Sequence, residues 1–282
     1  MGTNRIRLTL TLVRVPTKGV ARSLLRFYGS KMNSHELADA IAIPFLVIGM
    51  SYYFDPGTAA RASELGLNVF EYYGLGRGGT LGNVDTEVVF DAFTFFSPGA
   101  IDMLWTQSKK KADPVEVAIQ HVQSAYAYAD KTFADLDEGQ LQAFADATRK
   151  VVAAVPYGKH HLVDGYRKYE AANARHQAYL GAILMRELRG CVHIDAVKEA
   201  QISPIDAAYL ENPTIFKMHG YQDSEVSEVN AALEAKKKRA EEITTDYIAK
   251  FFDVLSDAER QAVHDGAFAM DEAIKNAAGA SV

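Results

Sequence analysis

Five of the eight prolines follow a side chain that can cap a helix, and this pattern restricts the possible folds more than any other feature. Proline suits the first position of a helix, where its missing N–H would have no partner. A Ser, Asp or Asn just before it can accept the exposed backbone amides. Each pair therefore predicts a helix start. The pairs are Asp55-Pro56, Ser97-Pro98, Asp113-Pro114, Ser203-Pro204 and Asn212-Pro213.

Apolar residues spaced three and four apart fill the stretches between these starts, so we predict an all-α multi-helix bundle. A break with Pro and Gly at 153–158 separates an aromatic-rich helical half, residues 32–155, from a second helical half, residues 156–282. Strand-like alternation occurs only in "IRLTLTLVRV" at 6–15. The predicted helices span 34–53, 56–65, 67–73, 86–96, 98–107, 114–132, 137–154, 160–189, 191–200, 204–211, 224–254 and 257–276.

Charge divides the chain near residue 31. Residues 1–31 carry seven Lys and Arg and no acid, so the rest of the chain holds 23 basic and 36 acidic residues and a net charge of −13. The basic segment is either a targeting sequence or an upstream extension that is not native, with Met32 as the true start. The acidic remainder disfavours non-specific binding to nucleic acid, because phosphate backbones repel it.

A single cysteine, Cys191, excludes an intrachain disulfide and fits a reducing compartment, so a cytoplasmic protein is expected. The longest apolar run, "IAIPFLVIGM" at 41–50, has about half the roughly 20 residues that a membrane span needs. We therefore expect no membrane partner.

Gly74, Gly76 and Gly79 form the spacing G-x-G-x-x-G, which in a strand–turn–helix unit would bind a dinucleotide. Here the flanks are helical and no parallel-strand pattern follows, so we reject that interpretation and name no cofactor. We expect instead that the glycines let two helices meet closely and adopt positive φ in a tight loop.

The aromatic residues around Arg77 form the first candidate site. Small-molecule sites are mostly apolar with a few polar groups, and this region supplies both. Arg77 would anchor an acidic ligand. The alternative is an aromatic core whose tyrosine hydroxyls reach the surface. The candidate residues are Tyr52, Tyr53, Phe54, Tyr72, Tyr73, Phe93, Phe95 and Phe96.

Arg189 and His193 lie four residues apart and would share one helix face, so a single ligand anion could satisfy both. The alternative is a partly buried histidine bonded to a carbonyl group, or a protein carboxylate such as Asp195 or Glu187 as the shared partner. No Glu-x-x-His or H-E-x-x-H pattern is present, so we expect no metal site. No G-x-S-x-G motif is present either, and Cys191 lacks a nucleophile signature.

Two segments, "SYYFDPGTAARASELGLNVFEYYGLGRGGTLGNVDTEVVFDAFTFFSPGAIDMLW" at 51–105 and "RGCVHIDAVKEAQISPIDA" at 189–207, resemble an uncharacterised actinobacterial family labelled SalK-like or EvbL-like. The resemblance implies an all-helical protein whose C-terminal half is helix-turn-helix-like or winged-helix-like. This chain has Gly49 where a histidine is often found, and its wing is reduced. The shared residues are Tyr53, Phe54 and Pro56, Gly76 and Arg77, Phe93 to Phe96 with Pro98, Arg189, Gly190 and His193, and Ser203 with Pro204.

A helix-turn-helix built from 204–211 and the helix beginning at 224 would approach DNA with residues 221–235, which hold four acids and no Lys or Arg. Phosphates would be repelled there, although "KKKR" at 236–239 lies further along. The predicted length of 224–254, about 45 Å, favours a homodimer through its apolar stripe.

These observations favour a small-molecule-binding all-helical protein with a helix-turn-helix-like scaffold. The alternatives are a ligand-responsive dimeric transcriptional regulator, which would bind DNA, and an enzyme that uses an Arg/His/Tyr pocket for acid–base chemistry.

Overall fold

All five cap–proline pairs begin helices. The computed structural model describes residues 31–279, and at each pair the side chain before the proline accepts a backbone amide of the new helix. Asp113, for example, accepts from the amides of Val115 and Glu116. The predicted starts are therefore confirmed. The helices are α4 (Pro56–Glu64), α7 (Pro98–Ile101), α8 (Pro114–Thr132), α12 (Pro204–Glu211) and α13 (Pro213–Met218).

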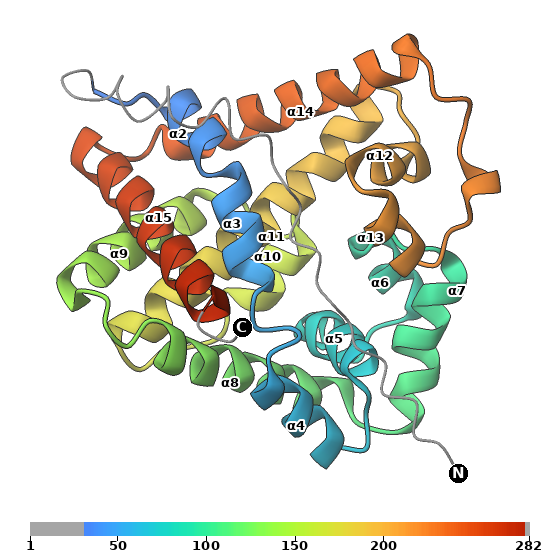
Figure 1. The fold of residues 1–282 in the computed structure, drawn as a ribbon, viewed down its shortest axis with the longest axis horizontal. Helices are drawn as coiled ribbons and strands as arrows, with labels where there is room; N and C mark the ends of the chain where they lie inside the picture. Colours follow the sequence, from blue (N-terminus) through green and yellow to red (C-terminus); the bar gives the residue numbers. More distant parts are fainter. Residues whose placement is uncertain (1–30, 280–282) are drawn as a thin grey trace. The chain divides into compact units, whose positions relative to one another are not determined.

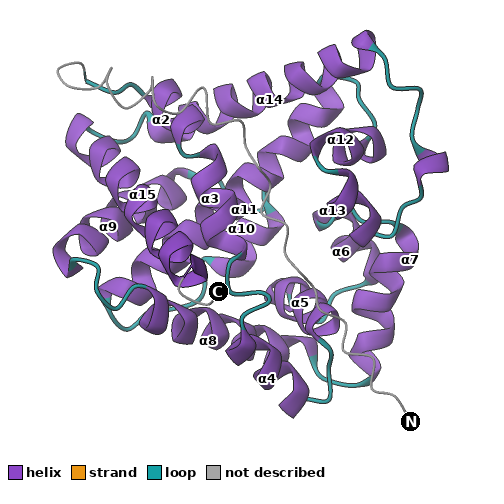
Figure 2. Cartoon of the chain, viewed as in Figure 1, coloured by secondary structure: helices purple, strands orange, loops and turns teal. Residues whose placement is uncertain are grey.

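The predicted all-α fold is confirmed, because no strand occurs within residues 31–279 (Figure 2). The strand-like stretch at 6–15 and nearly all of the basic N-terminal segment lie outside the described residues. A 3₁₀ turn (Gly79–Leu81) follows α5, and a π-helical turn (Asp102–Gln107) with a 3₁₀ turn (Ser108–Lys110) follows α7. The remaining helices are α2 (Ser34–Ala40), α3 (Ala42–Met50), α5 (Val69–Gly78), α6 (Thr86–Ala92), α9 (Glu138–Ala154), α10 (His161–Tyr166), α11 (Ala174–Glu199), α14 (Ala231–Phe252) and α15 (Asp257–Gly279).

Helix α11 is the central element of residues 33–279, which belong to one unit. It packs against α3, α8, α9, α10 and α14, and Figure 1 shows α3 crossing in front of it. Its middle stretch is buried almost without interruption from Ala178 to Leu188. The predicted boundary between residues 155 and 156 falls between α9 and α10 inside this unit.

The prediction of positive φ in the glycine stretch at 74–79 is wrong. Gly74, Gly76 and Gly78 continue α5 as ordinary helix, and the positive φ belongs to Gly82 (φ 97°), beyond the 3₁₀ turn. The predicted close approach of two helices is confirmed, because a Cβ on Gly76 would collide with the ring of His121 on α8. Packing on α8 therefore explains Gly76 and Gly79, and packing on the π-helical turn, at Leu104 and Trp105, explains Gly74 and Gly78.

Two predicted helix boundaries are also wrong. The predicted helix 160–189 is interrupted between Tyr166 and Ala174, and α11 then runs through Gly190, where a Cβ would meet open space. The predicted start at residue 224 moves to Ala231, capped by Asn230. The preceding residues are held by Asp206, which accepts hydrogen bonds from the backbone N and the hydroxyl of Ser227 at 2.8 and 2.9 Å.

Candidate functional site

Arg77 lies in the last turn of α5, and its side chain is buried against α11. Its guanidinium donates two hydrogen bonds to the Glu187 carboxylate, from Nε to Oε1 at 3.0 Å and from Nη2 to Oε2 at 2.6 Å. Its third contact is a hydrogen bond from Nη1 to the Tyr73 hydroxyl at 3.0 Å. This fork-to-fork geometry is the strongest form of an arginine–carboxylate pair.

A second arginine shares the same carboxylate. Arg186 donates from Nη1 to Glu187 Oε1 at 2.7 Å and to the Tyr53 hydroxyl at 2.9 Å. Gly49 on α3 makes room for it, since a Cβ there would lie 2.6 Å from Arg186 Cδ. We call Arg77, Arg186 and Glu187 the arginine–glutamate cluster. It reaches the surface at Arg186, which keeps 17% of its side chain accessible, whereas Glu187 keeps 1%.

The arginine–glutamate cluster carries one positive charge in excess. Burial opposes ionisation of Glu187, but the two guanidiniums outweigh it and lower the pKa of that carboxyl. No other carboxylate of residues 31–279 forms an ion pair with Arg77 or Arg186. Two cations therefore share one anion in a region largely withdrawn from water, an arrangement that is costly unless further partners are supplied.

The groups around the cluster are neutral. Burial lowers the pKa of His121 to about 3 and that of His219 to about 4, so both imidazoles are uncharged near pH 7. Burial also raises the pKa of the Tyr53 hydroxyl, which keeps its proton. The ring of Phe93 lies 4.5 Å from the Arg77 guanidinium carbon, within the range of a cation–π contact.

Three buried polar atoms near the cluster have no hydrogen-bond partner among the described residues. They are Arg186 Nε, His121 Nε2 and His219 Nδ1. Buried polar atoms are normally paired, and each exception needs an explanation. Donors and acceptors that do not pair with the protein are the groups that a polar ligand can use.

The structure brings four of the predicted ligand residues together and separates two. The ring centre of Tyr73 lies 4.9 Å from that of Tyr53 and 6.1 Å from that of Phe96. The Tyr73 hydroxyl also accepts a hydrogen bond from Arg77. Tyr72 instead bonds the hydroxyl of Ser124 on α8 at 2.9 Å. Phe54 is 42% exposed and packs against Phe70.

Arg189 and His193 belong to a second charged group on α11. Arg189 Nη2 lies 2.8 Å from one oxygen of Glu241 on α14, and His193 Nε2 lies 3.6 Å from the other. One anion does serve both residues, but it is Glu241 and neither Asp195 nor Glu187. His193 Nδ1 also bonds the Thr244 hydroxyl at 2.8 Å.

Lys237 completes this second group, which we call the Glu241 network. It pairs with Glu241 and, at 2.7 Å, with Glu211. Burial lowers the pKa of His193 to about 4, so the imidazole is neutral. Burial would raise the pKa of Glu241, but His193, Lys237 and Arg189 lower it to about 2. Two cations and two anions therefore balance in the network.

Neither Arg186 nor His219 is among the predicted site residues, and Glu187 is predicted only as an alternative partner of Arg189 and His193. The sequence does carry a signal for Arg186 and Glu187, because these adjacent charges directly follow the apolar stretch "AILM" at 182–185, where buried charges need partners. His219 follows α13 and faces Phe96 with ring centres 3.9 Å apart. No local pattern marks that contact.

Cys191 is not an activated nucleophile, because burial raises the pKa of its thiol to about 12. Within the described part of the chain, no three His, Cys, Asp or Glu side chains gather as metal ligands would.

The sequence model of a helix-turn-helix family matches residues 45–246, from α3 into α14. Comparisons with curated proteins and with solved structures gave no match. None of the helices in residues 31–279 is both long and apolar enough to cross a membrane.

Proposed function

We propose that this chain, which belongs to the helix-turn-helix family, binds a small aromatic carboxylate at the arginine–glutamate cluster. The observation that carries the proposal is the shared carboxylate: Arg77 and Arg186 hold only Glu187 between them. A ligand carboxylate would neutralise the remaining charge. Arg186 is the residue that would receive it, since its Nε has no partner and its side chain is partly accessible.

The side chains packed around the cluster suit an aromatic ligand better than an aliphatic one. Tyr53, Tyr73, Phe93 and Phe96 present rings, and aromatic pairs gain from edge and offset contacts beyond the area they bury. The unpartnered His219 Nδ1 could recognise a polar substituent on the ligand ring. Apolar walls with a few polar groups are the usual composition of a small-molecule site.

Replacing Arg186 tests this function. Arg186→Met leaves the Arg77–Glu187 pair intact and removes the excess charge, so we expect a free energy of unfolding within about 1 kcal/mol of wild type, or higher. Benzoate affinity should fall at least about tenfold, because a charge-assisted hydrogen bond is lost. Calorimetric titration with benzoate, and with benzamide as the uncharged analogue, measures this directly.

Arg189→Met is the matched control, because it removes an arginine from the same helix but from the Glu241 network. Benzoate affinity should be unchanged in this variant. A cluster with a purely structural role gives the opposite result: Arg186→Met would unfold far more easily than wild type, and no variant would differ in benzoate affinity.

A ligand-responsive regulator is the second candidate, supported by the family and by contacts of Phe96 and Ser97, which lie beside the cluster, with the residues that follow α13. The backbone N of Ser97 donates to the carbonyl of His219 at 2.9 Å, and the Tyr221 hydroxyl donates to the carbonyl of Phe96 at 3.1 Å. A bound ligand that displaces Phe96 would therefore move the segment after α13.

The charges on α14 rank this second function below the first. Lys237, Lys238 and Arg239 are already paired with glutamates of α12 or α14, which weakens their attraction for phosphates. A regulator would bind a DNA duplex selected from a random library in a salt-sensitive way, and benzoate would change that binding. Duplex binding that ignores benzoate would contradict this function.

A further inference from the structure

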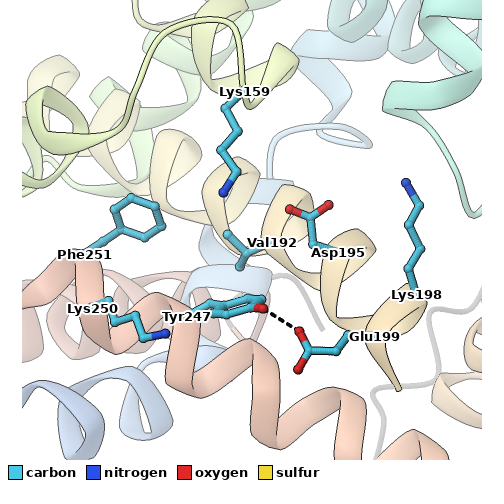
Figure 3. A pocket seen from close by; sticks show the side chains of 8 residues that line it. All are labelled: Lys159, Val192, Asp195, Lys198, Glu199, Tyr247, Lys250 and Phe251. Carbon is cyan, nitrogen blue, oxygen red and sulfur yellow. Dashed lines mark hydrogen bonds between the residues drawn. The ribbon is translucent and has the colours of Figure 1, made fainter. Parts of the chain in front are cut away.

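Helices α11 and α14 border a groove of about 470 Å³ on the side where the turn before α10 approaches them. Figure 3 shows Lys159 reaching from that turn toward α11, Asp195 and Lys198 rising from α11, and Tyr247 and Lys250 on α14. This volume is within the range of small-molecule sites. The groove uses no residue of the arginine–glutamate cluster.

The lysines of the groove are unusual in this protein because they lack anionic partners. From residue 32 to residue 279, four lysines form no ion pair and donate no hydrogen bond within the described chain, and three of them line this groove: Lys159, Lys198 and Lys250. The fourth, Lys236, lies elsewhere on α14. Lys250 has only a cation–π contact, with its Nζ 5.0 Å from the centre of the Tyr247 ring.

The two carboxylates in the groove do not neutralise these lysines. Glu199 accepts a hydrogen bond from the Tyr247 hydroxyl at 2.5 Å, and Asp195 forms no ion pair with any described residue. Three cations therefore face two acids, and the aromatic side chains of Tyr247 and Phe251 lie beside them. A compact anion can approach the ammonium groups, whereas a continuous polyanion would also meet Asp195 and Glu199.

We propose that this groove binds a phosphate monoester carried on a planar ring. The ammonium group of Lys159, which Figure 3 shows reaching over Val192 between Phe251 and Asp195, would contact the phosphate as a point charge. Lys250, beside Tyr247, would approach the phosphate from one end of the groove. The ring would lie against Tyr247 and Phe251. Phenyl phosphate has both parts and is the probe for this site.

Titration of the full chain with phenyl phosphate, followed by calorimetry, tests the proposal. The dissociation constant should rise at least about fivefold in Lys159→Ala and in Lys250→Ala, through loss of a charge-assisted contact. It should change less than about twofold in Lys236→Ala, which removes an equally unpartnered lysine outside the groove. Inorganic phosphate and phenol should each bind more weakly than phenyl phosphate.

Arg186→Met separates this site from the arginine–glutamate cluster. Phenyl phosphate should bind that variant as it binds wild type, whether or not benzoate binding is lost. The proposal is overturned if Lys236→Ala weakens binding as much as the groove variants, if Arg186→Met abolishes it, or if wild type does not bind phenyl phosphate. Displacement of phenyl phosphate by duplex DNA at equal phosphate concentration would assign the groove to nucleic acid and overturn it as well.

Discussion

The two charged groups on α11 are separated by little more than one turn, yet they differ in burial and in charge balance. The arginine–glutamate cluster faces α5 and α3, and its carboxylate is 1% exposed. The Glu241 network faces α14, and its carboxylate is 34% exposed. The first holds two cations on one anion, and the second pairs each cation with an anion. Water can therefore compensate a lost partner in the network but not in the cluster.

The largest expected loss of stability follows replacement of Glu187, the carboxylate of the arginine–glutamate cluster. Glu187→Gln leaves two buried guanidiniums without a carboxylate, so we expect a loss of about 3–5 kcal/mol in the free energy of unfolding. Glu241→Gln, the equivalent change in the network, should cost about 1 kcal/mol or less, because Lys237 keeps Glu211 and solvent reaches the rest. Denaturant unfolding of both variants at pH 7 measures the difference.

Equal losses for the two variants would contradict the contrast in burial. A Glu187→Gln protein as stable as wild type in the absence of any ligand would show that the two guanidiniums need no anion, and the proposed ligand site would lose its physical basis.

Local signals predicted the helix starts because capping is a local interaction. Ser203, for example, accepts from the amide of Asp206, three residues away. The helix boundaries that were predicted wrongly depend on contacts between residues far apart in the sequence. Residues 226–230 have a helical pattern, but Asp206 fixes Ser227 outside the helix, and this contact spans 21 residues of sequence. Periodicity cannot detect such a competitor.

The candidate site was predictable only in part, for the same reason. The aromatic segment and Arg77 were identified from composition, but the partner of Arg77 lies 110 residues along the chain. The shared face of Arg189 and His193 follows from helix geometry, whereas Glu241 comes from another helix, 52 residues after Arg189.

The resemblance to the actinobacterial family and the homodimer both stay predictions. The predicted helix length supports a dimer less strongly than expected, because α14 begins only at Ala231 and packs on α11 and α2 of its own chain.

Lowering the pH should reduce the free energy of unfolding through protonation of His193 in the Glu241 network. This loss should be intermediate in size. The folded pKa is about 4 and the ordinary value is 6.5, so between these values the unfolded chain binds the proton and the folded chain does not. Stability is therefore complete above about pH 6.5 and falls as the pH drops toward 4. At about 1.4 kcal/mol per pKa unit, the loss by pH 4 is on the order of 3 kcal/mol.

His193→Gln should flatten the plot of unfolding free energy against pH between 6.5 and 4, because the side chain no longer titrates. The slope that remains belongs to His121 and His219 near the cluster and to His160 before α10, whose pKa values are also lowered by burial. Urea unfolding at several pH values gives both curves. An unchanged slope in the variant would mean that His193 is protonated in the folded protein at the same pH as in the unfolded chain.

The smallest expected change in unfolding free energy is that of Arg189→Met. Its dependence on salt concentration distinguishes the exposed Glu241 network from the buried arginine–glutamate cluster. Arg189 is 26% exposed and Glu241 keeps Lys237 as a partner, so Arg189→Met should cost less than about 1 kcal/mol at low ionic strength. In about 1 M NaCl the screening length falls to roughly 3 Å, and the difference from wild type should vanish. The destabilisation by Glu187→Gln should persist in the same salt, because mobile ions do not reach a carboxylate that is 1% exposed. Denaturant unfolding of Arg189→Met and Glu187→Gln at both ionic strengths tests this difference. If salt removes the destabilisation in both variants, the arginine–glutamate cluster is open to solvent. If salt removes it in neither variant, the Glu241 network is as inaccessible to water as the cluster.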